Sequence, residues 1–404
     1  SRGLGDVYKR QAENGKAGVY PRGRTVKKMK IAILANDTTY TYNLRGALLR
    51  RLLAAGHRVT VISQLRGFWP ELEAMGCTLI GIDNDRHGKN PLQDGRLLLR
   101  YLSILRQEQP EAVLSFNIKP NIYGGMACRH LGIRFLPNVT GLGTALEYPG
   151  PLQALTCALY RIGVSRADCI FFQNRSNQDF FASRRLISPG TRSVLLPGSG
   201  VDLGAFSPLP YPRGDTVHFL FVSRILKEKG IDLYLHAARA IRRTHPEAVF
   251  HVCGCCDDPV YRAVMESAVQ AGDIVYHGEQ RDMRPFYEMA CCVVHPSYYP
   301  EGMANVLLEA AACARPIITT DRSGCAETVE DGRTGLLIPI RDQDALTAAL
   351  ERFLSLPWEQ RCDMGRLGRE KMEREFDRAI VADRYMQVLF PQKTITKERQ
   401  AIGL

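Results

Sequence analysis

Two glutamates, Glu301 and Glu309, stand eight positions apart in the segment "HPSYYPEGMANVLLEAAACARPIITTD", residues 295–321. The second lies in an apolar run with a helical pattern, where a carboxylate is disfavoured unless a partner compensates it. The run before them, "CCVVHPS", predicts a buried strand, and we expect the next helix to begin near Asn305. The two carboxylates therefore flank the start of a helix that follows a strand.

A helix N-terminus in this position favours phosphate, because its free N–H groups and positive dipole end point at the ligand. Gly302 would let the backbone approach such a ligand closely. Glu301 and Glu309 could then accept hydrogen bonds from hydroxyl groups on either side of a diphosphate, one from a sugar ring and the other from a ribose. The alternative is structural, with Glu301 capping the helix and Glu309 pairing with an arginine.

Two cations lie in a comparable place earlier in the chain. In "FVSRILKEKG", residues 221–230, Arg224 and Lys229 follow a predicted strand and precede a predicted helix. Arginine binds a diphosphate through its bidentate fork and lysine through its point charge. Alone they could equally be surface charges, but together with the glutamates they indicate a diphosphate site.

Strands and helices alternate along most of the chain, which predicts parallel sheets flanked by helices. A Pro- and Gly-rich stretch, "LLPGSGVDLGAFSPLPYPRGD", interrupts the alternation and divides it into two series. The expected strands are 29–37, 57–63, 111–117, 166–174, 217–225, 248–254, 273–278, 291–297, 316–320 and 334–339. The expected helices are 42–56, 122–132, 176–186, 231–246, 260–272 and 283–290, then the one near Asn305 and a helical tail. We therefore expect two doubly wound α/β domains that face each other, with ligands in the cleft at the carboxyl ends of the strands.

The domain boundaries follow from the same pattern. Residues 1–28 are read as a non-native or disordered leader, 29–196 as the N-terminal domain and 197–213 as a linker. Residues 214–375 form the C-terminal domain, and 376–404 a final helix that packs back toward the N-terminal domain. The net charge of +11 is uneven, since residues 29–196 carry 20 Lys/Arg against 11 acids, and residues 197–404 carry 25 against 29. This basic first half suggests an anionic partner or membrane surface, although a solvated basic face would give the same count.

Three segments of the second half resemble the nucleotide-sugar half of retaining glycosyltransferases of family 4, which have the GT-B fold. They are "SRILKEKG", "PEGMANVLLEA" and "SGCAETVEDGRTGLLIP". The resemblance implies that Arg224 and Lys229 bind the donor diphosphate, that Glu301 contacts the transferred sugar, and that Glu309 binds the ribose of UDP. The donor site is then expected to comprise Arg224, Lys229, Glu301, Gly302, Met303, Ala304, Asn305, Val306 and Glu309. Of these, Arg224, Lys229 and Glu301 would act in catalysis, with no protein nucleophile, no metal and no cofactor.

The segment "SFNIKPNIYGGMACRHLGIRFLPNVTGLGTALE", residues 115–147, is similar to bacterial enzymes that extend lipid-linked sugars. These include N-acetylgalactosaminyltransferases that act on undecaprenyl-diphosphate-bacillosamine, and capsule and exopolysaccharide transferases. The implied acceptor side comprises strand-end and loop residues that face the cleft: Asn117, Lys119, Asn138, Thr140 and Gly141. The two asparagines could equally be turn residues. Many family members carry a Gly-Gly pair after the first strand, where "NDTTYTYNLR" stands here, so the resemblance leaves open how the first domain meets the donor.

Several other motifs carry weaker signals. Asp83–Asp85 ("DND") matches a metal-binding pattern but reads as a polar loop, and Cys253–Asp258 lacks a second cluster at zinc spacing. His295 is expected at a strand end, and the sequon at Asn174 carries no meaning in a cytosolic protein. Glu327 could lie near the donor or could stabilise a turn.

The composition excludes several classes of protein. No apolar run reaches about 18 residues and no signal peptide is visible, so we expect no transmembrane helix. The resemblance implies a cytoplasmic enzyme peripheral at the inner face of the membrane, where the basic first domain would rest on anionic lipid. The 12 scattered cysteines are expected to be reduced. Nucleic-acid binding is not expected, because the arginines are dispersed. The expected function is transfer of a hexose or N-acetylhexosamine from a UDP-sugar to an undecaprenyl-diphosphate-linked acceptor. The alternatives are a sugar-nucleotide epimerase and a non-catalytic nucleotide- or lipid-binding subunit.

Overall fold

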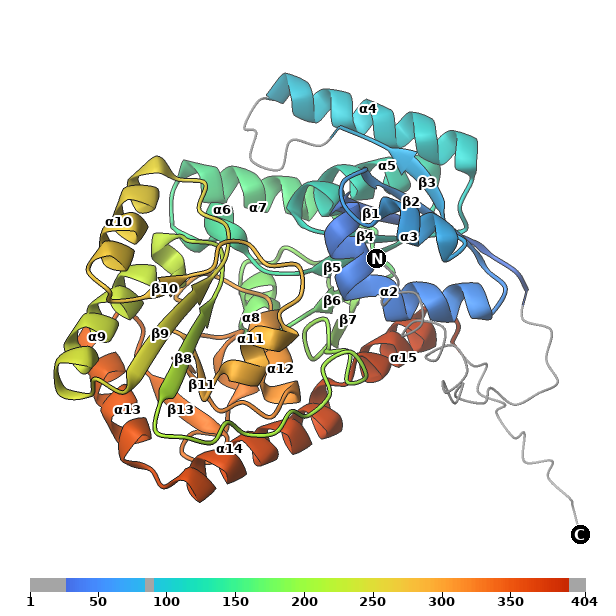
Figure 1. Ribbon diagram of the computed structural model, residues 1–404. Helices are drawn as coiled ribbons and strands as arrows, with labels where there is room; N and C mark the ends of the chain where they lie inside the picture. Colours follow the sequence, from blue (N-terminus) through green and yellow to red (C-terminus); the bar gives the residue numbers. More distant parts are fainter. Residues whose placement is uncertain (1–26, 84–90, 392–404) are drawn as a thin grey trace, which may run out of the picture.

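The computed structural model describes residues 27–83 and 91–391, which form two domains, each built on a parallel sheet (Figure 1). Most of the predicted leader, 1–28, and the end of the final segment, 392–404, lie outside the described residues. The same holds for residues 84 and 85 of the Asp83–Asp85 motif.

The N-terminal sheet has seven strands in the order β3-β2-β1-β4-β5-β6-β7, and every pairing is parallel. The strands are β1 (Lys30–Asp37), β2 (Arg58–Gln64), β3 (Thr78–Gly81), β4 (Ala112–Phe116), β5 (Arg134–Val139), β6 (Cys169–Phe172) and β7 (Arg192–Leu195). The helices are α2 (Thr38–Ala54), α3 (Trp69–Ala74), α4 (Pro91–Glu108), α5 (Gly125–Leu131), α6 (Gly143–Glu147), α7 (Pro151–Gly163) and α8 (Arg175–Ser183). A π-helical turn, Pro120–Gly124, precedes α5.

Helix α2 begins four residues before its predicted start, for a local reason. The Asp37 carboxylate caps the helix by accepting a hydrogen bond from the backbone N–H of Tyr40 at 2.9 Å. The polar stretch that replaces the Gly-Gly pair therefore forms the strand end and first turn of α2.

The C-terminal sheet has six strands in the order β10-β9-β8-β11-β12-β13, again all parallel. The strands are β8 (Val217–Val222), β9 (Ala248–Cys253), β10 (Val275–Tyr276), β11 (Cys292–His295), β12 (Ile317–Thr320) and β13 (Gly335–Ile338). The helices are α9 (Ile231–Thr244), α10 (Pro259–Gln270), α11 (Arg284–Met289), α12 (Asn305–Ala312), α13 (Gln343–Ser355) and α14 (Trp358–Lys371). Shorter turns of helix lie at Lys227–Lys229, Ala326–Thr328 and Met372–Phe376.

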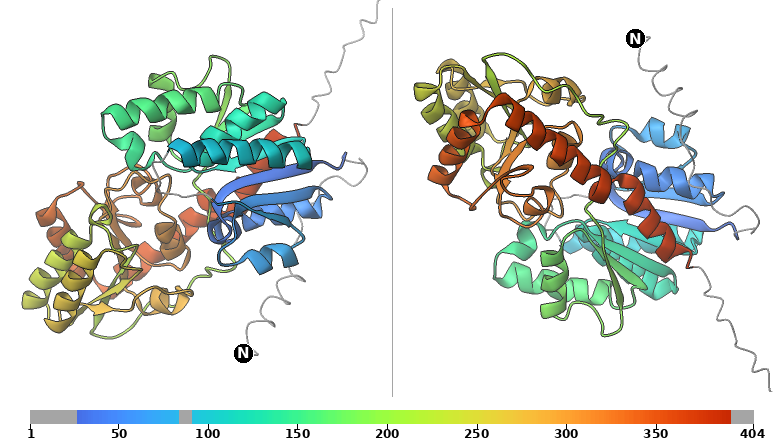
Figure 2. Two further views of the ribbon diagram at one scale, coloured as in Figure 1. Left: turned by 90° about the horizontal axis from the view of Figure 1, so that it is seen from above. Right: turned by 90° about the horizontal axis from the view of Figure 1, so that it is seen from below.

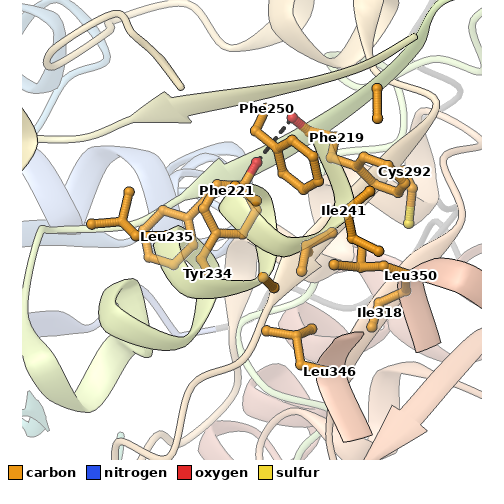
Figure 3. Packing of buried hydrophobic residues seen from close by; sticks show 14 of the residues in the cluster. Phe219, Phe221, Tyr234, Leu235, Ile241, Phe250, Cys292, Ile318, Leu346 and Leu350 are labelled. Atoms are coloured by element: carbon orange, nitrogen blue, oxygen red, sulfur yellow. Dashed lines mark hydrogen bonds between the residues drawn. The ribbon is translucent and has the colours of Figure 1, made fainter. Parts of the chain in front are cut away.

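Aromatic and aliphatic side chains fill one layer between this sheet and its helices (Figure 3). Phe219 stacks on Phe250 with ring centroids 5.0 Å apart, and the Tyr234 hydroxyl donates to the carbonyl oxygens of Phe219 and His251, both at 3.0 Å. The buried hydroxyl is thus satisfied, so the tyrosine packs in an apolar layer without an unpaired polar group.

The chain crosses between the domains twice. After β7 it enters the C-terminal domain through residues 196–216, and α14 leads into α15 (Arg378–Leu389), which returns to the N-terminal sheet (Figure 2). The Arg134 guanidinium donates to the carbonyl oxygens of Val388 and Leu389, both at 2.7 Å, and so holds the C-terminal end of α15. The prediction of two doubly wound parallel-sheet domains is confirmed.

No helix within the described residues is long and apolar enough to span a bilayer. All 12 cysteines are free thiols.

Candidate active site

The start of α12 has no side-chain cap. The residue before the helix, Ala304, has no side chain that caps it, and its own N–H donates to the Gly324 carbonyl oxygen at 2.8 Å. The amide oxygen of Asn305 is buried without a hydrogen-bond partner. The helix begins where the sequence predicted. Its Leu307 N–H donates to the Ala304 carbonyl oxygen at 3.0 Å, which leaves the N–H groups of Asn305 and Val306 for an anion.

Lys229 and Glu301 form an ion pair beside this helix start. Lys229 is only 8% exposed, and its ammonium lies 4.9 Å from the centre of the Tyr299 ring. Gly230, with φ of +80°, turns the chain into α9, and a Cβ there would lie 2.2 Å from the Pro296 carbonyl oxygen. The close approach of the loops after β8 and β11 therefore places the lysine against the glutamate.

Arg224 lies in the loop that follows β8 and is half-buried. Within the described part of the chain no carboxylate pairs with its guanidinium. A half-buried cation without a counter-charge favours binding of an anion, because its charge has already lost part of its hydration.

Glu309 lies on α12, in a largely apolar environment. Its carboxylate accepts a hydrogen bond from the Tyr287 hydroxyl at 3.0 Å. Burial raises the pKa of Glu309 to about 7, while the Tyr287 hydroxyl and the nearby Arg378 oppose the rise. Over residues 27–83 and 91–391 we find no ion pair to Glu309, so the structural alternative of an arginine partner is not realised as a direct contact.

The loop that carries Glu301 is held by the opposite domain. The Asn174 side-chain amide donates to the carbonyl oxygens of Gly302 at 2.7 Å and Glu301 at 3.1 Å. A Cβ at Gly302 would lie 2.2 Å from the Thr140 carbonyl oxygen and 2.4 Å from the Gln173 amide oxygen. The glycine therefore allows a close contact between the domains, whereas the sequence had suggested that it lets a ligand approach.

Met303 and Ala304 are buried in the hydrophobic core of the C-terminal domain, at 5% and 3% exposure. Val306 packs against the same cluster while remaining partly exposed. The side chains of Met303 and Ala304 thus face away from the cleft, and this segment presents mainly backbone to a ligand.

The residues predicted on the acceptor side do not all lie together, since some contact the Glu301 loop and others are paired or buried elsewhere. Thr140 and Gly141 meet the Glu301 loop, and Asn117, at φ of +78°, donates to the Thr140 hydroxyl at 3.4 Å. Lys119 forms an ion pair with Asp94 at 2.8 Å. Asn138 is completely buried and contacts the Tyr385 hydroxyl of α15, so its side chain does not reach the cleft as the sequence had suggested.

The weaker motifs are mostly structural. Both carboxylate oxygens of Glu327 hold a turn, accepting from the Ser323 hydroxyl at 2.8 Å and the Gly324 N–H at 2.6 Å. His295 is 1% exposed, and burial together with the neighbouring Lys229 lowers its pKa to about 3, which keeps the imidazole neutral. Cys255 and Cys256 follow the end of β9 and are partly buried.

Sequence reasoning did not assign Asn174 to the site. Its side-chain oxygen caps α8 by accepting from the Asn177 N–H at 2.8 Å, while its amide holds the Glu301 loop. The sequence feature that could have indicated this role is an asparagine at the end of a predicted strand and just before a predicted helix, which is the usual position of an N-cap.

Two family models match, one in each domain. The family described as "Glycosyl transferase 4-like" matches residues 30–174, and "Glycosyl transferases group 1" matches residues 216–355. The first match covers β1 to β6 and ends just before α8, and the second covers β8 to the end of α13.

Individual relatives match over different lengths. The chain spans about half the length of the first curated relatives it matches, such as a Mycobacterium tuberculosis glycogen synthase, with 28% identity over 222 residues (53% of this chain, 52% of that protein). It is 22% identical over 377 residues to N,N'-diacetylbacillosaminyl-diphospho-undecaprenol alpha-1,3-N-acetylgalactosaminyltransferase from Campylobacter jejuni (89% of this chain, 98% of that protein).

The fold matches a crystal structure of Anabaena Alr3699/HepE in complex with UDP and glucose. The TM-score is 0.74 at 15% identity, over 89% of this chain and 99% of that one. At this identity the match shows the fold, and the two family models supply the sequence relationship. The chain therefore belongs to the GT-B glycosyltransferases, with a 4-like N-terminal domain and a group 1 C-terminal domain.

Proposed function

We propose that this protein is a retaining glycosyltransferase that moves a hexose or N-acetylhexosamine from a UDP-sugar to a lipid-linked saccharide, of the undecaprenyl-diphosphate type. The observation that carries the proposal is the ion pair of Lys229 with Glu301 just before the start of α12, with Arg224 in the same segment after β8 as the lysine and Glu309 on the helix itself. The Campylobacter relative, whose name describes a transferase acting on an undecaprenol-linked sugar, supports the acceptor class.

The chemistry requires stabilisation of a leaving diphosphate. The bond between the anomeric carbon and the β-phosphate oxygen breaks, the acceptor oxygen bonds to that carbon on the same face, and the acceptor proton passes to the leaving phosphate. Arg224, Lys229 and the N–H groups of α12 would oppose the charge that develops on the phosphate. Since these groups are fixed before the reaction, the proposal requires neither a metal ion nor a cofactor.

Glu301 and Glu309 would bind hydroxyl groups at the two ends of the donor. Glu301 is next to the cation that holds the diphosphate, which fits a contact with the transferred sugar. Glu309 lies about one turn into α12, and its ionised form accepts hydrogen bonds only. It would accept from the ribose hydroxyls.

We also propose that the protein works at the cytoplasmic face of an anionic membrane, bound through the N-terminal domain. Helices α4 and α7 both lie against α5 and its preceding π-helical turn, on one face of the first sheet (Figure 1). This face exposes Leu92 and Leu99 on α4, at 74% and 66%, and Leu155 on α7, at 58%. Basic residues including Arg96, Arg100 and Arg106 lie on the exposed side of α4, a combination that favours an anionic lipid surface.

Thermal unfolding with UDP, GDP, ADP and CMP tests the donor. A ligand at 100 times its dissociation constant stabilises by about 2.7 kcal/mol, so a rise in Tm with UDP alone is expected. Arg224→Ala should abolish that rise without changing the Tm of the free protein, since no ion pair is lost. A larger shift with GDP or ADP would change the donor, and no shift with any nucleotide would favour a non-catalytic subunit.

Stereochemistry and membrane binding need separate tests. NMR of the product should show the anomeric configuration of the donor, and an inverted product would refute retention. Flotation with vesicles that contain anionic lipid should recover the wild type, and neutral vesicles should recover less. Leu99→Asp with Leu155→Asp should reduce flotation, whereas Val260→Asp, at an equally exposed position on α10, should not.

A further inference from the structure

A cavity of about 380 Å³ lies between the two domains, next to Glu301. Its N-terminal wall is formed by α6, by the residues that follow Arg175 in α8, and by Leu142. Its C-terminal wall is formed by Pro300, Glu301, residues 321–323 and Ile340. We propose that this cavity binds an uncharged sugar ring of the acceptor, an inference that rests on the glycosyltransferase function proposed above.

The charge of the walls excludes the acceptor's phosphate groups. Glu147, Glu301 and Asp321 line the cavity, against one cation, Arg322. Arg322 donates to the Glu147 carboxylate at 2.5 Å, so its charge is already compensated across the domain boundary. Glu301 is compensated in the same way by Lys229, so Asp321 is the lining carboxylate for which the described residues supply no ion pair. An anion would meet this carboxylate and no free cation among the lining residues, whereas neutral hydroxyl groups would find acceptors. The site is therefore suited to a sugar and not to a diphosphate.

Asn177 supplies the observation that points most directly to a ligand. It is 4% exposed and lines the cavity, yet the structure gives its side-chain nitrogen no hydrogen-bond partner. A buried amide donor without a partner is rare in a folded protein. A hydroxyl oxygen of a bound sugar would satisfy it, and the apolar side chains of Leu146 and Phe180 in the same walls would pack on the C–H face of the ring.

The cavity is separate from the groups proposed to bind UDP. Arg224, Lys229 and Glu309 are not among its lining residues, and Glu301 is the one residue that it shares with the donor site. A ring held in the cavity would therefore meet the donor at Glu301, where the transferred sugar is expected. The acceptor sugar would then lie next to the residue that pairs with Lys229, one of the cations proposed to bind the diphosphate.

The test compares the acceptor with the donor in one set of variants. Asn177→Leu keeps the size of the side chain and removes the amide, and Gln178→Leu, on the same helix but outside the cavity, is its control. The probes are the preferred UDP-sugar and an undecaprenyl diphosphate carrying one N-acetylhexosamine. Asn177→Leu should raise the KM for the lipid-linked acceptor about tenfold, while UDP-sugar hydrolysis without acceptor and thermal stability remain unchanged.

A second variant makes the result independent of Asn177. Ile340→Trp should fill the cavity from the other domain, at a position that is 39% exposed and tolerant of substitution, and should also raise the acceptor KM. An equal rise in the KM for UDP-sugar hydrolysis would assign the cavity to the donor sugar and overturn the inference. So would unchanged kinetics in both variants of an active enzyme. A wild type that neither binds UDP nor hydrolyses UDP-sugars would instead refute the proposed function, and the inference with it.

Discussion

Replacing Glu309 with glutamine should stabilise the protein while weakening UDP binding. Burial raises the pKa of this carboxyl to about 7, so the native state holds its proton more tightly than the unfolded chain does. The free energy of unfolding therefore falls as the pH rises from about 4.5 to 7, as the unfolded chain and then the native state lose the proton. With about 1.4 kcal/mol per pKa unit, the ionised carboxylate costs about 3 kcal/mol above pH 7.

The assay is thermal unfolding of the wild type and Glu309→Gln between pH 4.5 and 8. The glutamine oxygen still accepts from the Tyr287 hydroxyl, so the variant removes the charge and keeps the hydrogen bond. At pH 8 its Tm should be about 3–4 °C higher than that of the wild type, and the two should converge near pH 4.5. Glu266→Gln, at an exposed position on α10, should show no such difference.

Two results would refute this reasoning. A Glu309→Gln variant that is less stable at pH 8 would mean that Arg378 holds the carboxylate as an ion pair and that burial does not dominate. A Tm difference that does not change with pH would mean that Glu309 is not the titrating group. On the ligand side, UDP affinity should fall at least tenfold in the variant, and in the wild type it should fall below pH 7 as the carboxylate is protonated.

Three further predictions concern other parts of the molecule. Burial lowers the pKa of His251 to about 4, so the free energy of unfolding should fall by up to about 3 kcal/mol as the pH decreases from 6.5 to 4. Urea unfolding of His251→Gln should show no such fall over the same pH range. Lys229→Met should destabilise by about 2 kcal/mol because it leaves Glu301 uncompensated, whereas Arg224→Ala should not, and calorimetry distinguishes the two. The Arg134 side chain donates to the last carbonyl oxygens of α15, so Arg134→Ala should speed amide hydrogen exchange in that helix. An unchanged exchange rate would show that Arg134 does not stabilise the end of α15.

Much of the fold could be predicted from the sequence, because along the C-terminal half the periodicity of apolar residues and the positions of turn residues such as Gly and Pro indicate the same elements. The predicted start of α12 matches the structure at Asn305. The strand β5 was missed for a definite reason: it contains Pro137, which pairs with Ser115 of β4 inside the sheet. Proline lacks the N–H that a central strand donates, so the sequence rule argues against a strand here.

The site was harder to predict where its contacts cross the domain boundary. Lys229 meets Glu301 because strand ends of one parallel sheet share an edge, and Arg224 follows the same strand as the lysine, while the roles of these residues toward a diphosphate stay predictions. Asn138 stands at such an end too, yet α15 covers it from the far end of the chain. The residues around Asn138 in the sequence do not indicate that Tyr385 of α15, 247 positions later, packs against it.

The contacts of Asn174 suggest why the two domains of this protein are not independent modules. Its side chain holds the carbonyl oxygens of Glu301 and Gly302, and its oxygen caps α8, the helix that carries Asn177. A rotation of one domain against the other would therefore move the glutamate loop and the cavity wall together. A side chain at position 302 would clash with Thr140, so the two domains can approach this closely only because glycine stands there. The position of the Glu301 loop in the C-terminal domain thus depends in part on hydrogen bonds donated by a residue of the N-terminal domain.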